Sequence, residues 1–161
     1  RMNQAIVWGQ PSWSNHYPSD HYPFMYKTRS KYNSIIKIRL ADILLLKAEA
    51  YVETGNLQAA AALVNTVRNR AKLADLPATT VSSKEKMADA VLNERRLELA
   101  FEGQRWFDLV RTGKVFSILN SLNTRDSGRL PMTPVTEETV LLPVPQTQID
   151  KNPNLTQNKG Y

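Results

Sequence analysis

The sequence predicts a mainly α-helical fold in which helix pairs accompany an irregular, loop-rich portion. Apolar residues recur at helical spacing over 38–54 and 57–72, and a further helical pattern follows from residue 84. Residues 1–33 show no such period. The chain of 161 residues has the size of one domain with a real core, and its longest apolar runs are far too short to span a bilayer.

Residues 1–37 form an aromatic segment at the start of the chain. Its first 33 residues hold seven aromatic side chains broken by Gly9 and three prolines, which predicts loop with a possible short strand. Aromatic rings on loops can stack on a sugar ring, or they can anchor the loop to the helices behind it. The candidate ligand contacts are Trp8, Trp13 and Tyr17 for stacking, with Asn15, His16 and Asp20 as polar partners.

The excess of positive charge lies in the same segment. The net charge is +6, and Lys27, Arg29, Lys31 and Lys37 account for most of the imbalance. The first three alternate, so in a strand they would share one face. They could contact an anion or nucleic acid, or form a solvated strand edge that discourages pairing. No nucleic-acid recognition motif accompanies them, which favours the edge and predicts no nucleic-acid partner.

Metal, redox and cofactor chemistry are not expected. The chain has no Cys, which excludes disulfides, thiolate metal sites and a Cys nucleophile within it. His16 and His21 are five residues apart and have no third ligand nearby. We therefore expect no metal site and no cofactor.

Residues 38–54 and 57–72 predict two helices joined by a turn at Gly55 and Asn56. One repeat of two helices cannot bury both of its faces, so it must stack on something. The apolar face of the first helix is expected to contain Leu40, Ile43, Leu44, the Lys47 stem, Ala48 and Tyr51, with Asp42, Glu49 and Glu53 on another face. The spacing resembles a tetratricopeptide repeat in Leu44, Ala48, Tyr51, Gly55, Ala60 and Val64.

The third helix is expected to run from about Lys84 to Glu102. Ser82 with Glu85 matches a capping box, and Ser83 is an alternative cap. Gly103 predicts a break before a further helix over 105–111, which Gly113 ends.

The stretch 94–111, ERRLELAFEGQRWFDLVR, interleaves eight charged residues with bulky apolar ones. Such charges are too costly to bury unpaired. Glu94, Glu98 and Glu102 would share one helix face as like charges unless cations intervene, and steps of three from Glu102 onward offer ion pairs if the helix continues. We expect a structural ion-pair network formed by Glu94, Arg95, Glu98, Glu102, Arg105, Asp108 and Arg111.

A glycosidase using Glu98 or Glu102 is the catalytic alternative for this stretch. Carboxylates beside several arginines should stay ionised, whereas a general acid needs a raised pKa. No catalytic residue is assigned, and the chain is not expected to be an enzyme.

The remainder of the chain predicts a short helix over 114–122, a polar loop over 123–139 and a polar tail. Pro143 and Pro145 flank the end of the apolar run 140–144, which makes it a sheet edge or an extended packed segment.

Three blocks of the sequence stand out together: IRLADILLLKAEAYVETGN with AAALVNTVRNRA, then ERRLELAFEGQRWFDLVRTGK, and finally LLPVPQTQIDKNPNLTQNKGY. With these blocks the chain resembles the C-terminal part of the SusD/RagB family of bacterial outer-membrane nutrient-binding lipoproteins. The blocks cover most of residues 38–161 in the family's order, whereas residues 1–37 match only loosely. The resemblance divides the chain into a segment 1–37 that forms part of a ligand-binding portion and a helical domain 38–161 with an extended tail.

The resemblance implies tetratricopeptide-like helix pairs that bind a glycan or other nutrient without cleaving it. It implies a location on the extracellular face of the outer membrane and a TonB-dependent (SusC-like) transporter as partner. Membrane attachment would come only from a lipid anchor outside this chain, which is expected to be a C-terminal portion. A helical-repeat scaffold that binds proteins and no small ligand is the alternative.

Overall fold

The structure, a computed structural model, describes residues 6–8, 23–25, 27, 37–124 and 133–161. Its contacts divide the chain into two compact units, residues 1–105 and 106–161. Helices dominate the described residues, which confirms the predicted mainly α fold class. Within these residues, no helix is both long and apolar enough to cross a membrane.

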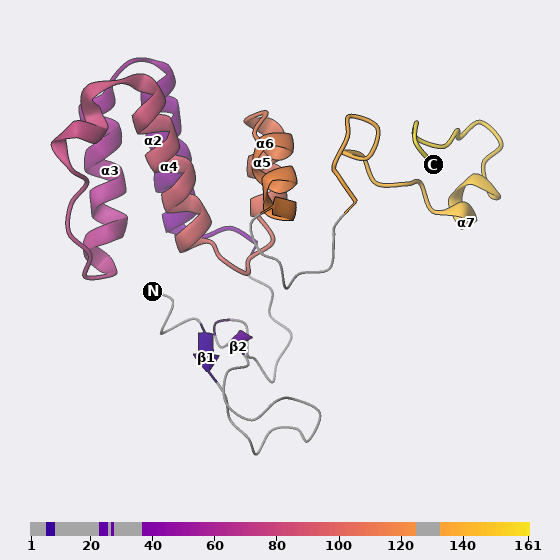
Figure 1. Ribbon diagram of the computed structural model, residues 1–161, viewed down its shortest axis with the longest axis horizontal. Helices are drawn as coiled ribbons and strands as arrows, with labels where there is room; N and C mark the ends of the chain where they lie inside the picture. Colours follow the sequence, from indigo (N-terminus) through magenta and orange to yellow (C-terminus); the bar gives the residue numbers. More distant parts are fainter. Residues whose placement is uncertain (1–5, 9–22, 26, 28–36, 125–132) are drawn as a thin grey trace. The chain divides into compact units, whose positions relative to one another are not determined.

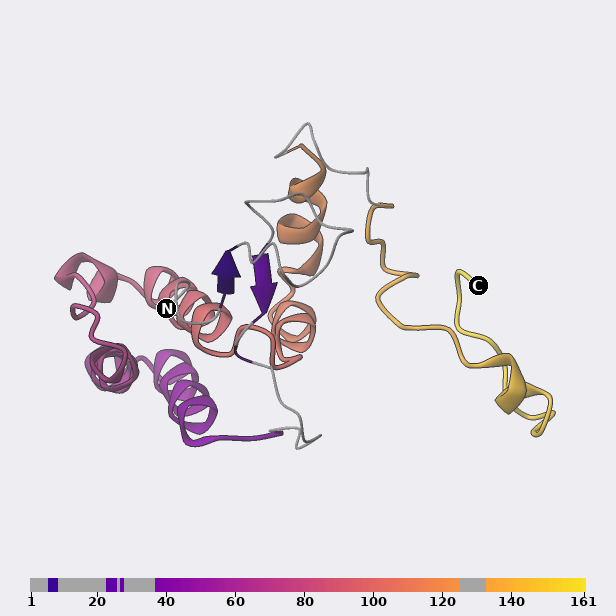
Figure 2. The ribbon, with the colours of Figure 1, turned by 90° about the horizontal axis from the view of Figure 1, so that it is seen from below.

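Three helices form the core of the first unit: α2 (Leu40–Glu53), α3 (Leu57–Arg70) and α4 (Lys84–Glu98). They lie side by side in Figure 1 and are seen nearly end-on in Figure 2. Gly55 takes a φ of 80° between α2 and α3, a conformation that glycine adopts without a steric cost. Asn56 then caps α3, because its side chain accepts a hydrogen bond from the Ala59 amide at 3.3 Å.

Ser83 caps α4 by accepting a hydrogen bond from the Lys86 amide at 3.2 Å. Ser82 instead ends a short 3-10 helix, η2 (Ala78–Ser82), that leads into α4. The capping box predicted at Ser82 is therefore wrong, and the alternative cap is correct.

The buried stripe of α2 differs from the predicted one. Leu40 and Ile43, expected inside, are 73% and 49% exposed, whereas Asp42, expected outside, is buried. Apolar residues surround most of α2, so their period alone cannot select the inward stripe. The observed stripe buries Ala41, Leu45, Ala48 and Val52 together with Asp42, which pairs with Arg95 of α4. The core cluster comprises Ala41, Leu45, Ala48, Val52, Ala60, Ala61, Val64, Val67, Met87 and Val91.

Helix α4 ends at Glu98, four residues before the predicted end at Glu102. Phe101 and Gly103 take left-handed φ angles of 68° and 80°, which no α-helix can contain. The next helix, α5 (Arg105–Arg111), begins and ends as predicted. The interruption moves Glu102 off the helix face that carries Glu94 and Glu98.

Two short strands lie ahead of the helices in the first unit. β1 (Ile6–Trp8) pairs antiparallel with β2 (Pro23–Met25), with Ile6 opposite Met25 and Trp8 opposite Pro23. The aromatic segment thus contains a strand, which the sequence raised as a possibility.

The second unit contains α6 (Val115–Asn120), η3 (Ser121–Thr124) and α7 (Gln146–Ile149). The apolar run 140–144 forms neither helix nor strand and carries Leu142 at 74% exposure. Gln157 clamps its end, since its side chain accepts from the Val144 amide at 2.7 Å and donates to the Val144 carbonyl at 3.0 Å. A side-chain amide therefore replaces a strand partner at this point.

The corrected stripe of α2 predicts opposite outcomes for two leucines of one helix. Leu45 is fully buried, so Leu45→Ala should lower the free energy of unfolding by about 2–5 kcal/mol. Leu40→Ala, on the exposed side, should change it by less than about 0.5 kcal/mol. Urea unfolding followed by far-ultraviolet circular dichroism measures both. A larger loss of unfolding free energy for Leu40→Ala than for Leu45→Ala would contradict the observed buried stripe and support the predicted one.

Candidate functional site

The candidate ligand contacts all belong to the aromatic segment. Trp8 is the last residue of β1, where the backbone pairs with Pro23 of β2. The other five candidates lie outside the described residues, and their grouping around a ligand stays a prediction. They are Trp13, Asn15, His16, Tyr17 and Asp20.

The end of α4 carries a cluster of carboxylates and cations. Glu98 and Glu102 have side chains that are only 4% and 11% exposed. Arg39, the residue before α2, grips Glu102 at two points: Nε donates to Oε2 at 2.8 Å and Nη2 to Oε1 at 2.9 Å. Its Nη1 also donates to Glu98 Oε1 at 2.7 Å. The planar guanidinium suits this multipoint recognition of carboxylates.

Lys27 joins the same cluster from the aromatic segment. Its Nζ donates to the backbone carbonyls of Glu98 at 2.6 Å and Ala100 at 3.2 Å, and it pairs with the Glu102 carboxylate. Lys27 is therefore not the solvated strand-edge charge that its alternating spacing favoured. It instead places positive charge at the C-terminal end of α4, where the helix dipole favours cations.

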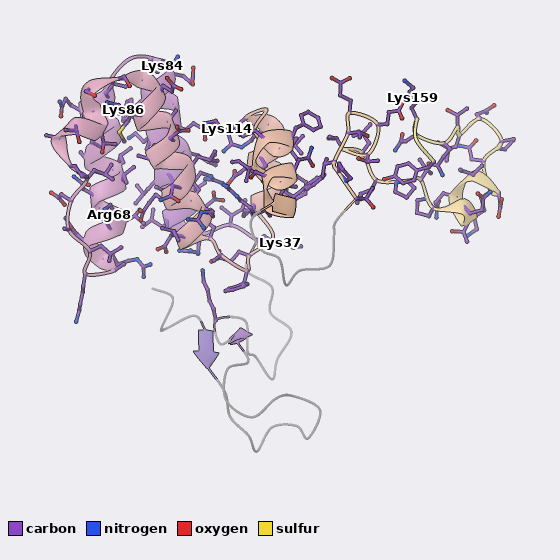
Figure 3. The ribbon with its side chains drawn as sticks, viewed as in Figure 1. Lys37, Arg68, Lys84, Lys86, Lys114 and Lys159 are labelled. Carbon is purple, nitrogen blue, oxygen red and sulfur yellow. The ribbon has the colours of Figure 1, made fainter. Side chains whose placement is uncertain are left out.

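The last turn of α3 supplies two more cations to α4. Arg70 Nη2 lies 2.5 Å from Glu98 Oε1, and Arg68 Nη1 lies 3.1 Å from Glu94 Oε2. Figure 3 labels Arg68 on α3. The two glutamates on one face of α4 are therefore separated by arginines from a neighbouring helix, which removes the like-charge conflict.

Asp42 and Arg95 form a buried ion pair between α2 and α4. Arg95 Nη1 lies 2.7 Å from Asp42 Oδ1, and both side chains are less than a tenth exposed. Each charge would be very costly to bury alone, so the pair fixes the register of the two helices.

The charged residues after Gly103 contact groups that are close to them in the sequence. Arg105 Nη1 donates to the Leu92 carbonyl at 3.4 Å in the first unit. In the second unit, Arg111 Nη2 lies 2.8 Å from Asp108 Oδ1, three residues earlier on α5. The helix does not continue through Gly103, so the ion pairs at intervals of three residues do not begin at Glu102. Glu102 instead pairs with Arg39 and Lys27.

The electrostatics at Glu102 favour a permanent charge. Burial alone would raise the pKa of Glu102, but hydrogen bonds from Arg39 and Lys27 and their positive charges lower this pKa below its ordinary value. A glycosidase general acid needs the opposite shift. Among the described residues, no group of three or more acidic or His side chains could hold a metal ion.

The sequence identified the glutamates of this cluster but missed the residues that meet them. Lys27, Arg39, Arg68 and Arg70 come from 26 to 75 positions away, as the spacing of each pair in the sequence shows. The stacked like charges signalled that cations were needed. Nothing local to the stretch specified which ones.

Comparison with known proteins gives a consistent result. The model of the SusD family matches residues 12–161. A SusD-like protein of Formosa agariphila is 36% identical over 134 residues, covering 80% of this chain and 25% of the relative. The starch-binding protein SusD of Bacteroides thetaiotaomicron is 32% identical over 149 residues, covering 92% of this chain and 25% of the relative.

Solved structures agree with the sequence matches. A SusD superfamily protein from Bacteroides vulgatus has a TM-score of 0.65 at 27% identity, covering 89% of this chain and 29% of that one. Surface glycan-binding protein A from Bacteroides thetaiotaomicron, in complex with laminarihexaose, has a TM-score of 0.61 at 29% identity, covering 77% of this chain and 24% of that one. The chain spans about a quarter of the length of these curated relatives.

The lowered pKa of Glu102 predicts a pH-dependent contribution to stability. The contribution is present in full above the unfolded pKa of about 4.3 and is lost as pH falls through the lower folded pKa. Glu102→Gln should therefore cost about 1–2 kcal/mol at pH 7, and this difference should shrink toward zero in strong acid.

Urea titrations at a series of pH values from 7 to 3 measure that difference. Glu53→Gln is the matched control, since Glu53 pairs with Lys84 at 2.7 Å but its side chain is 65% exposed. It should change stability by less than about 0.5 kcal/mol at every pH. A cost of Glu102→Gln that does not vary with pH would contradict the assignment.

Proposed function

Since the chain belongs to the SusD family, we propose that it is part of a non-catalytic glycan-binding protein at the bacterial outer-membrane surface. The protein would deliver its ligand to a TonB-dependent transporter. The observation that carries the proposal is the family match over residues 12–161, supported by the structural likeness to a surface glycan-binding protein.

The aromatic segment suits a neutral sugar ligand. The relatives are described as binding starch and laminarihexaose, which are both uncharged glucose polymers. Such ligands offer flat apolar ring faces and hydroxyl groups, and proteins meet them with aromatic side chains and a few polar groups. Trp8, Trp13 and Tyr17 supply the aromatic faces, and Asn15, His16 and Asp20 supply the polar partners.

The charged cluster supports binding without cleavage. Glu98 and Glu102 are the carboxylates that a hydrolase would need in this stretch, and both are already engaged by arginines. Because the pKa of Glu102 is lowered, this carboxylate is ionised at neutral pH and cannot act as a general acid. Their role in this proposal is to hold the framework.

The exposed side of α2 supports a protein partner. Ile38, Leu40, Ile43 and Leu46 are between 39% and 73% exposed on or just before this helix. Exposed apolar side chains gathered along one helix are typical of a surface that a partner protein covers. This surface also favours the alternative function, a helical scaffold that binds protein and no small ligand.

The glycan proposal predicts binding of neutral oligosaccharides without turnover. We expect calorimetry to detect binding within a panel that includes maltoheptaose and laminarihexaose. Trp8→Ala and Trp13→Ala should each weaken it about tenfold, the equivalent of roughly 1.4 kcal/mol of lost stacking.

Phe107→Ala is the matched aromatic control, because Phe107 is 66% exposed on α5 and is not one of the candidate ligand contacts. It should leave the affinity unchanged. Absence of binding across the panel, or release of shorter products during incubation, would contradict the proposal.

The partner proposal predicts that the native full-length protein co-purifies with a TonB-dependent transporter from its outer membrane. Mass spectrometry of the affinity-purified complex identifies the partner. Recovery of a glycan-competent protein without such a transporter would contradict delivery. If residues 1–33 can be removed without loss of the transporter, and no oligosaccharide binds the intact protein, the scaffold alternative holds.

A further inference from the structure

Lys27 makes an unusually complete set of contacts for a lysine near the surface. An ammonium group has three N–H donors and no acceptor. The Lys27 ammonium meets three acceptors, the carbonyls of Glu98 and Ala100 and the carboxylate of Glu102. Its side chain is 31% exposed, so water competes for these contacts only in part. Every donor of Lys27 is thus directed at the C-terminal end of α4.

Groups other than Lys27 also hold these acceptors in place. The carbonyls at the end of a helix lack partners within the helix and need outside donors. Arg39 Nη2 donates to the Glu98 carbonyl at 2.6 Å while the same guanidinium fixes the carboxylates of Glu98 and Glu102. Arg70 holds Glu98 from α3. The acceptors at the end of α4 therefore form a receptor, that is, a binding site for the Lys27 ammonium whose atoms other residues also fix.

Lys27 connects this receptor to the strands of the aromatic segment. It lies two residues after β2, which ends at Met25, and β2 pairs with β1, which ends at Trp8. A short path of covalent and hydrogen bonds therefore runs from the end of α4 through Lys27 to the backbone of Trp8.

We propose that Lys27 is a positioning residue of the glycan site, which anchors the β1–β2 pair to the end of α4. This rests on the proposed function, because Trp8 is one of its candidate stacking residues. Lys27 does not touch the ligand in this role. An uncharged oligosaccharide is thereby bound with an affinity that depends on an ion pair distant from it.

Backbone hydrogen exchange tests the anchoring without any ligand. Lys27→Met keeps the length and apolar stem of the side chain and removes the charge and donors. Exchange at the amides of residues 6–8, 24 and 25 should accelerate about tenfold, while α2, α3 and the first turns of α4 stay unchanged. Lys84→Met is the control, because Lys84 pairs with Glu53 on the helical part of the chain (Figure 3). Unchanged exchange at the strands in Lys27→Met would overturn the anchoring.

Calorimetry with maltoheptaose and laminarihexaose tests the role in binding. Lys27→Met should lower the affinity for the oligosaccharide about tenfold, whereas Lys27→Arg should keep most of the wild-type affinity. Lys84→Met should leave the affinity unchanged. Raising the salt from 50 mM to 1 M should weaken binding to the wild-type chain and leave binding to Lys27→Met unchanged. Salt has no such effect on a neutral ligand through direct contacts.

The outcomes separate this proposal from the proposed function. Faster strand exchange with unchanged, salt-independent affinity would overturn the positioning role while leaving glycan binding intact. If neither oligosaccharide binds the wild-type chain, the glycan function is refuted for these ligands together with the positioning role. The exchange rates then still decide whether Lys27 anchors the strands.

Discussion

Glutamates placed four residues apart on α4 impose the constraint on which the first unit depends. Glu94 and Glu98 are nearly inaccessible to water, and a buried carboxylate is tolerated only when cations meet it. The cations come from the last turn of α3 and from Arg39 before α2. Any arrangement of the three helices that moved these cations away would leave charge buried without compensation. The apolar core supplies most of the favourable free energy, and the ion pairs select one packing among several that an apolar core would accept.

Elements that depend on local sequence signals could be predicted, whereas features that depend on contacts between distant charged residues could not. The helices α2, α3 and α5 follow from period, glycine and capping residues, which are all local signals. The inward stripe of α2 was mispredicted because it depends on α4: Asp42 is buried only since Arg95 reaches it. The early end of α4 was missed for a similar reason. Arg39 and Lys27 donate to the carbonyls of Glu98 and Ala100 and to the carboxylates of Glu98 and Glu102. These contacts replace hydrogen bonds that the chain gives up where it leaves the helix.

The candidate ligand contacts could be predicted even less well than the helices, because they too depend on tertiary structure. A sequence pattern can suggest aromatic side chains for a sugar ligand from composition alone, but stacking requires rings at a common surface, which is a property of tertiary structure. The family match rests on the helical framework and the tail as well as on most of the aromatic segment, since it begins at residue 12. It therefore identifies the architecture more firmly than the ligand. One relative is named as a starch-binding protein and another is solved in complex with laminarihexaose, so proteins that share this architecture are described with different glycans.

Like charges stacked on one helix face are a local conflict, and proteins seldom keep such conflicts without a compensating contact. In this chain the conflict between Glu94 and Glu98 is resolved by Arg68 and Arg70, two residues apart at the end of α3. Glu102 escapes it by leaving the helix, and its freed carboxylate then binds two cations from the N-terminal side of the chain. The glutamate that lies beyond the end of the helix is thus the one that reaches Lys27. A framework residue and the aromatic segment are joined at this point, so a glutamate that first suggested catalysis instead connects the aromatic segment to the helices.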